Sequence, residues 1–300
     1  MDSSAAPAGK IELWSLPWTD WRAVLKRVFA FMSTERVTLT AAGVSYYTLL
    51  ALFPALAALV SVYGLITDAN SLSAHLDALA GIVPETILRF IGGELNRLIQ
   101  NNPGRLGISA AVSLLVALWS ANGGVKSMFW AMNIAYNTEE ERSFIKLNLI
   151  TLAFTLAAMV VFVVVINALV VIPLLVGALE LGALGRLLAT VISGAVAFII
   201  VYAAIVVIYR FGPSRPPAAW RWITPGAVAA AVVWLIASIG FSFYLSNFSN
   251  YDATYGTLGT AIGLLIWLYI SAFIVIVGAD VNAELEKQAT GDTKAAPDSA

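Results

Sequence analysis

The sequence predicts an all-α fold, a polytopic membrane helix bundle with six transmembrane helices plus interfacial amphipathic helices, and three observations support it. The 300 residues are 60% hydrophobic and 12% charged, with a mean hydropathy of +0.84, whereas an average soluble domain is about 45–50% apolar and about 25% charged. The chain contains six long uncharged stretches. Its lysines and arginines gather on alternate connections between them. We therefore expect a membrane protein.

Each of the six uncharged stretches is long enough to cross a bilayer as one helix. A span needs about 20 apolar residues, and lipid forces its backbone to satisfy its own hydrogen bonds. The expected spans cover about 39–66, 106–125, 147–176, 187–209, 223–245 and 256–279. They form a single domain over residues 1–287. The small and polar residues 288–300 lack apolar periodicity and are expected to form a disordered cytoplasmic tail.

The distribution of lysine and arginine predicts the orientation, because short cytoplasmic connections carry an excess of both residues. The N-terminal segment, the second and fourth connections and the C-terminal tail hold thirteen of them, and the other three connections hold four. Both termini are therefore expected in the cytoplasm. Charged residues interrupt the first thirty positions, so no signal peptide is expected.

Two amphipathic segments are predicted beside the spans. Residues 19–32, with Thr19 as the N-cap, place apolar side chains at helical spacing and predict an interfacial helix. The connection 68–105 contains a second amphipathic stripe that starts near Pro84. This external amphipathic loop either rests on lipid or the bundle, or it covers an external cavity.

Composition excludes several classes of function. The chain has no cysteine, which excludes disulfides, thiolate metal sites and iron–sulfur clusters. Its only histidine is His75, whereas a catalytic zinc site usually takes two or three. No phosphate-binding loop of the G-x-x-x-x-G-K-[ST] type is present, so ATP is not expected to drive the protein directly. We predict no catalytic residue, no metal ligand and no cofactor. A net charge of −1 without a basic cluster also argues against nucleic acid as a partner.

Two stretches resemble the YihY/BrkB family of bacterial membrane proteins. The first is residues 41–54, AAGVSYYTLLALFP; the second is residues 247–286, which begin NFSNYDATYGTLG and contain WLY and GADVNAE. The resemblance implies a six-span protein of the bacterial cytoplasmic (inner) membrane, with an external amphipathic loop after the first span. Asp280 stands where the family more often has glutamate, which keeps the carboxylate and shortens its reach.

The labels carried by members of this family imply different activities. Members have been labelled as transporters, as virulence-associated envelope proteins and, in older naming, as a ribonuclease that processes transfer RNA. A metal-dependent nuclease needs clustered histidine and carboxylate ligands. The acidic residues of this chain are scattered through its connections, so we do not expect the ribonuclease label to apply.

Polar groups inside the spans are candidates for a substrate pathway, because such groups are costly in hydrocarbon. Tyr46 and Tyr47 belong to a polar band in the first span, and Pro54 predicts a helix kink beyond it. We expect Tyr46, Tyr47, Asn122 and Asp280 to line the path. For the tyrosines, the alternative is packing in which neighbouring helices satisfy the hydroxyls.

Three further features are interpreted structurally. Gly259 and Gly263 form a G-x-x-x-G motif that favours close helix packing. Lys126 and Asp280 both lie at predicted cytoplasmic span ends, where they either pair or extend separately to water. The acidic run 139–141, with the arginine that follows it, is interpreted as a solvated connection.

Two functions remain open on the sequence alone. The first is a transporter or exporter of an amphiphilic or lipid-like substrate, and the second is a membrane scaffold or envelope-assembly protein that transports nothing. The expected partners are membrane lipids, and assembly into a homo-oligomer is left open.

Overall fold

The structure is a computed structural model of the chain, and it describes residues 17–66, 93, 106–177, 182–216, 220–248 and 257–290. Within this part of the chain, all regular secondary structure is helical, which confirms the predicted fold class. The helices are α1 (Trp18–Met32), α2 (Glu35–Ile66), α5 (Leu106–Ala135), α6 (Phe144–Gly177), α7 (Gly182–Phe211), α8 (Trp220–Phe248) and α10 (Thr257–Thr290).

The long helices are compatible with the six predicted spans. Helices α2, α6, α7, α8 and α10 each contain a segment long and apolar enough to cross a membrane. Helix α5 has 30 residues and is also long enough to be a span. The protein is therefore a multi-pass membrane protein.

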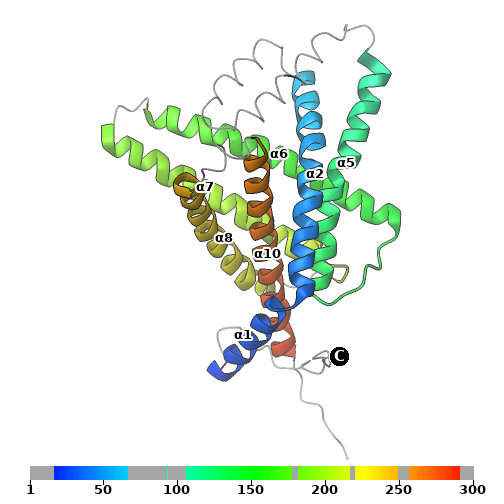
Figure 1. Cartoon of the computed structure of the whole chain (residues 1–300), viewed down its shortest axis with the longest axis vertical. Coiled ribbons are helices and arrows are strands. Elements are labelled where there is room, and N and C mark those ends of the chain that lie inside the picture. The colour runs from blue at the N-terminus through cyan, green and yellow to red at the C-terminus, as the bar shows by residue number, and fades with distance from the viewer. Residues whose placement is uncertain are drawn as a thin grey trace, which may run out of the picture.

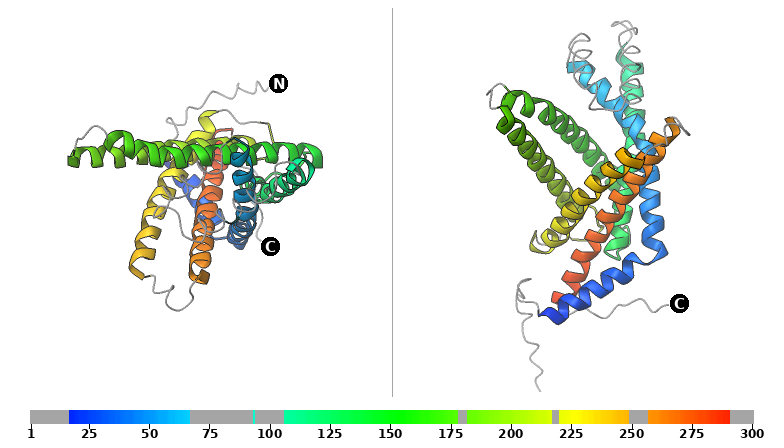
Figure 2. Two further views of the ribbon diagram at one scale, coloured as in Figure 1. Left: turned by 90° about the horizontal axis from the view of Figure 1, so that it is seen from above. Right: turned by 60° about the vertical axis from the view of Figure 1, so that its left-hand side comes forward.

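The helices form an open bundle (Figure 1). Helices α2, α5 and α10 stand side by side, and α8 packs along α10. The α6–α7 hairpin crosses this group obliquely and projects to one side in both views of Figure 2. Helix α1 lies across the end of the bundle where α10 finishes, so the two outermost described elements meet at the same end.

Helix α1 covers the predicted helix 19–32 but begins one residue earlier. Its N-cap is Pro17, which is extended and makes no side-chain cap, so the prediction that Thr19 is the N-cap was wrong. Proline fixes its own φ near the helical value, and the Pro17 carbonyl already accepts a hydrogen bond from the amide of Asp20 at 3.0 Å. The chain has thus entered the helix before it reaches Thr19.

Small residues allow two helix pairs to approach closely. On α5, a Cβ added to Gly124 would lie 3.2 Å from the Cβ of Ala51 on α2. Gly226 of α8 and Gly278 of α10 form the second close crossing. Beside it, the side chain of Asn282 accepts a hydrogen bond from the amide of Gly226 at 2.7 Å and donates one to the carbonyl of Ile223 at 3.0 Å.

Some of the predictions fall where the structure leaves them untested. The external loop 68–105 lies outside the described residues apart from Gly93. Helix α10 continues to Thr290, and residues 291–300 lie outside the description. Gly259 and Gly263 both lie on α10, where their packing role stays a prediction. Pro54 lies inside α2, which continues as one helix on both sides of it.

Candidate functional site

A row of buried polar side chains lies between α5 and α6. Asn148, Thr151 and Thr155 are spaced so that they share one face of α6, and Asn122 of α5 lies opposite Thr155. The Thr155 hydroxyl lies 3.4 Å from the side-chain oxygen of Asn122 and donates to the carbonyl of Thr151 at 2.9 Å. We call these four residues the α5–α6 seam.

Two groups of the seam have no hydrogen-bond partner among the described residues. The amide nitrogen of Asn122, a fully buried residue, lacks an acceptor, and the amide oxygen of Asn148 lacks a donor. The nitrogen of Asn148 donates to the carbonyl of Phe144 at 2.7 Å, so only its oxygen is unpaired. A buried polar group without a partner is destabilising, and such groups are rare in folded proteins. The seam therefore has room for two further hydrogen bonds: one from the nitrogen of Asn122 to an acceptor, and one from a donor to the oxygen of Asn148.

Lys126 lies one helical turn from Asn122, towards the end of α5. Its ammonium nitrogen is 4.8 Å from the centre of the Trp119 ring and 5.9 Å from the centre of the Phe144 ring. In the described part of the chain it makes no ion pair with Asp280. Of the two readings of Lys126 and Asp280, the structure thus supports separate contacts.

Asp280 belongs to a charged cluster between α10 and α1. It is buried, and one of its carboxylate oxygens has no hydrogen-bond partner in the described part of the chain. The charged side chains that act on it are Glu284, Lys287 and Arg27. Glu284 is paired with the guanidinium of Arg27 and, at 2.7 Å, with the ammonium of Lys287. We call these four residues the α1–α10 cluster; through it, the surface helix α1 is tied to the last transmembrane helix.

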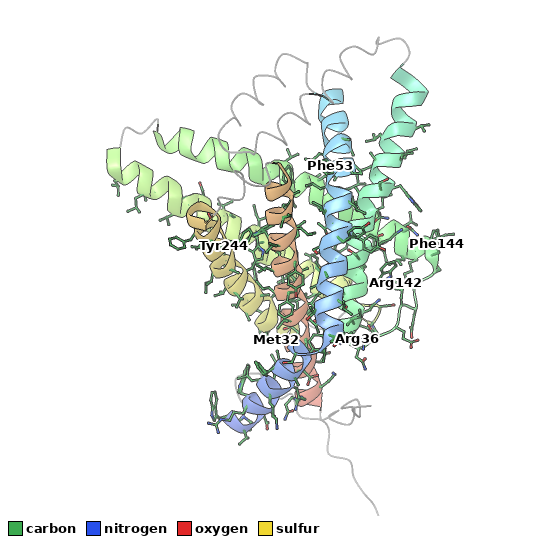
Figure 3. All side chains as sticks on the ribbon, viewed as in Figure 1. Met32, Arg36, Phe53, Arg142, Phe144 and Tyr244 are labelled. Atoms are coloured by element: carbon green, nitrogen blue, oxygen red, sulfur yellow. The ribbon has the colours of Figure 1, made fainter. Side chains whose placement is uncertain are left out.

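The connection between α5 and α6 is a structured corner, so its interpretation as merely solvated was wrong. Arg142 donates to both carboxylate oxygens of Glu140, at 2.6 and 2.8 Å, and to the carbonyls of Phe211 and Gly212 at the end of α7. Figure 3 shows Arg142 just before the start of α6, where Phe144 is labelled. The sequence of this connection is the same whether its charged side chains are hydrated or paired. Whether Arg142 is hydrated or bonded depends on how closely the end of α7 approaches it.

Asn133 and Glu140 complete this α5–α7 corner. The Asn133 amide donates to Glu140 at 2.9 Å, and its oxygen accepts from the amide of Ser214 at 2.7 Å. Partial burial of the Glu140 carboxyl acts to raise its pKa. The hydrogen bonds from Arg142 and Asn133, together with the charge of Arg142, outweigh that effect and hold the pKa at about 2.

A tyrosine–arginine contact lies next to this corner, where α5 ends. The guanidinium of Arg215 lies 4.2 Å from the centre of the Tyr136 ring and is paired with Glu286 of α10 at 2.8 Å. Burial raises the pKa of Tyr136 to about 12. The ends of α5, α7 and α10 are thus held together by charges and polar groups.

Tyr46 and Tyr47 lie on the outer surface of α2. They are 54% and 46% exposed, and their rings meet edge to face with centres 5.5 Å apart. Neither hydroxyl has a hydrogen-bond partner among the described residues. The tyrosine surfaces are free to contact lipid or a ligand, and whether they line a substrate path stays a prediction.

The four residues predicted to share a path therefore lie in three places. The tyrosines form one pair on α2, Asn122 belongs to the α5–α6 seam, and Asp280 belongs to the α1–α10 cluster. Sequence reasoning missed Thr155, which contacts Asn122 from α6. The spacing of Asn148, Thr151 and Thr155 is a signal that could have identified them, since it places three polar groups on one face of an apolar span.

No group of three or more histidine, aspartate or glutamate side chains suited to holding a metal ion occurs in the described ranges.

Comparisons with known proteins place the chain in a family. The profile of the family described as "Virulence factor BrkB" matches residues 28–300. The ribonuclease-like protein YfkH of Bacillus subtilis (strain 168) is 31% identical over 281 residues, which cover 88% of this chain and 95% of the relative. No solved structure matches.

More distant relatives are membrane proteins by name. A UPF0761 membrane protein of Xanthomonas campestris pv. campestris (strain B100) is 27% identical over 260 residues, 84% of this chain and 58% of the relative. Another, from Nitrosospira multiformis, is 43% identical over 77 residues, 26% of this chain and 18% of the relative. The match over residues 28–300 confirms the resemblance seen in the sequence, and this multi-pass membrane protein belongs to the virulence factor BrkB family.

Proposed function

We propose that the protein is an inner-membrane transporter or exporter of an amphiphilic, lipid-like substrate, with both termini in the cytoplasm and without direct use of ATP. The observation that supports this proposal best is the unpartnered amide of Asn122 inside the α5–α6 seam. Polar groups at membrane depth mark substrate pathways in many transporters. A polar headgroup that entered the seam would offer an acceptor to the amide nitrogen of Asn122, while its hydrocarbon chains remained in lipid.

The second candidate is a scaffold that holds envelope proteins together, and a specific observation favours it. Helix α1 is fixed to α10 through Val24, Val28 and Leu285, yet it exposes Trp18, Leu25 and Phe29. This exposed apolar face suits either the membrane interface or a partner protein. In a scaffold, the unpaired polar groups of the seam would bind no ligand and would only be a defect in the packing of α5 against α6.

A lipid-transfer assay separates the two functions. The purified protein is reconstituted into vesicles that contain a short-chain fluorescent lipid, and a membrane-impermeant quencher reports the lipid that moves between leaflets. We expect wild-type vesicles to exchange lipid at least tenfold faster than protein-free vesicles. The variant Asn122→Leu, which removes the buried amide, should lose most of this gain.

Two further variants guard the interpretation. Thr155→Val removes the hydroxyl beside Asn122 and, like Asn122→Leu, should slow lipid exchange. Ser127→Ala is the matched control on α5, because the buried Ser127 hydroxyl donates only to Gly124 of its own helix at 2.7 Å. Exchange by wild-type vesicles no faster than by protein-free vesicles would overturn the transport proposal and favour the scaffold.

A further inference from the structure

One continuous face of α5 changes from apolar to cationic along its length. Residues 112, 116, 119, 123, 126 and 130 follow one another at spacings of three and four, which places them on the same side of the helix. Val112 and Val116 are exposed at its beginning, and Trp119 is 55% exposed below them. Lys126 and the exposed Trp130 follow towards the end of α5. The face therefore has an apolar part and a charged part.

The surface is open between the tryptophan and the lysine. Gly123 lies between them on this face, and no neighbouring atom lies within 4 Å of the place where its Cβ would be. Phe144, at the start of α6 and 70% exposed, closes the other side: its ring centre is 6.4 Å from that of Trp119. Trp119, Lys126 and Phe144 thus form an aromatic–lysine site where α5 meets the start of α6. Figure 3 labels Phe144 at this place.

The positive charge of this site has no counterpart among the residues that the structure describes. Among the described residues, Lys126 contacts only aromatic rings and makes no ion pair. A lysine at the end of a span extends its ammonium towards water or towards an anion. Basic pockets between transmembrane helices on the cytoplasmic side are known to receive anionic lipid headgroups. The face fits such a molecule, with Val112 and Val116 placed for the chains and Lys126 for the headgroup.

We propose that the aromatic–lysine site binds the anionic headgroup of a lipid-like molecule at the entrance to the α5–α6 seam. This inference rests on the proposed transport function and assigns its substrate class, an amphiphile with a phosphate or carboxylate headgroup. Asn122, one helical turn from Lys126, supplies a buried amide nitrogen without an acceptor among the described residues, and we assign it as the next donor for such a headgroup. The rings of Trp119 and Phe144 hold the ammonium in place and exclude water from one side of it.

Binding of two lipids with identical chains tests the site. The protein in detergent micelles is titrated with brominated-chain phosphatidylglycerol or phosphatidylcholine, and quenching of tryptophan fluorescence reports binding. We expect phosphatidylglycerol to bind at least tenfold more tightly. Lys126→Gln should abolish this preference, and Lys126→Arg should retain it. Lys146→Gln is the matched control, because Lys146 is an exposed lysine on the same helix as Phe144 and the substitution makes the same charge change.

Three outcomes would overturn the inference. The first is a phosphatidylglycerol preference that survives in Lys126→Gln, and the second is an equal loss in Lys146→Gln. The third is competition by soluble glycerol phosphate at the concentration where the lipid binds, which would identify a site for free anions. Thermal unfolding of each variant in the same detergent verifies that it is folded.

Failure of the inference is distinguishable from failure of the transport proposal. If wild-type vesicles exchange lipid but Lys126→Gln leaves the phosphatidylglycerol preference intact, only the headgroup assignment is wrong. If phosphatidylglycerol binds selectively at Lys126 but no lipid is exchanged, the site is a lipid-binding site on a protein that does not transport lipid.

Discussion

Gly226 of α8 and Gly278 of α10 cross so closely that neither position has room for a side chain. A Cβ on Gly278 would lie 2.9 Å from the carbonyl oxygen of Gly226 and 2.7 Å from the Cβ of Ala230. Tyr209 of α7 meets the same region, where its hydroxyl donates to the carbonyl of Val275 at 2.7 Å. The three helices α7, α8 and α10 thus meet at one small-residue crossing.

Substitution of Gly226 by alanine should push α8 and α10 apart at this crossing. The added methyl group meets the backbone of α10, which cannot give way as a flexible side chain would, and overpacking of this kind costs about 1–3 kcal/mol of unfolding free energy. Gly240→Ala is the control on the same helix, because the space around Gly240 is open. Thermal unfolding in detergent should show a lower midpoint for Gly226→Ala alone. Equal midpoints for the two variants would contradict the close crossing.

The Glu140–Arg142 pair predicts a specific dependence of stability on pH. The pKa of Glu140 is lowered to about 2 in the folded protein, from an ordinary value of 4.5. The charged carboxylate therefore stabilises the fold above about pH 4.5, and this contribution is lost as the pH falls towards 2. The unfolding midpoint of the wild type should exceed that of Glu140→Gln at pH 7, and the gap should close as the pH approaches 2.

Glu141→Gln serves as the control for this pH series. The Glu141 side chain is exposed, and the residue contacts Ser214 through its backbone amide at 3.0 Å, so the substitution should leave the midpoint unchanged throughout. A gap between the wild type and Glu140→Gln that is independent of pH would show that the carboxylate charge does not stabilise the α5–α7 corner.

The tyrosine pair on α2 allows function to be tested apart from stability. Tyr46→Phe and Tyr47→Phe each remove a hydroxyl that has no hydrogen-bond partner in the described part of the chain, so neither should lower the unfolding midpoint. If the hydroxyls meet substrate, at least one variant should fail to complement an envelope-stress phenotype in a strain that lacks the gene. Full complementation by the double variant and by Pro54→Ala would remove the case for a path along α2.

The orientation in the membrane can be tested with single cysteines, because the natural chain has none. Ser4→Cys and Ser299→Cys should be protected from a membrane-impermeant thiol reagent in intact cells, since the excess of lysine and arginine favours cytoplasmic termini. Ser73→Cys and Ser249→Cys should react. Labelling of either terminus from outside would contradict the predicted orientation. It would also place Lys126 and Asp280 at the external side of the membrane.

A ribonuclease assay tests the activity suggested by the name of the Bacillus subtilis relative. The chain has one histidine, and in its described ranges no three histidine, aspartate or glutamate side chains gather to hold a metal ion. Purified protein should cleave transfer RNA no faster than a mock preparation, with or without added divalent metal. Cleavage that elutes with the protein and is lost on substitution of an acidic residue would show that this expectation is wrong.

The spans and the amphipathic character of α1 could be predicted from the sequence. In lipid, each helix satisfies its backbone hydrogen bonds within its own segment, so length and hydrophobicity alone identify a span. The helical spacing of apolar residues in 19–32 likewise depends only on neighbouring positions. Motif resemblance in residues 41–54 and 247–286 identified the family for the same reason, because a motif is a local property.

The polar contacts depend on residues that are distant in the sequence, and only the tertiary structure decided them. Arg27 and Glu284 are separated by 257 positions, and nothing near either residue in the sequence indicates the other. Lys126 could be placed at the end of a span, but its contact with Phe144 requires α6 to fold back beside α5. A charged or amide side chain has the same local sequence whether it faces water, lipid or a partner, and the packing of whole helices determines which of these it meets.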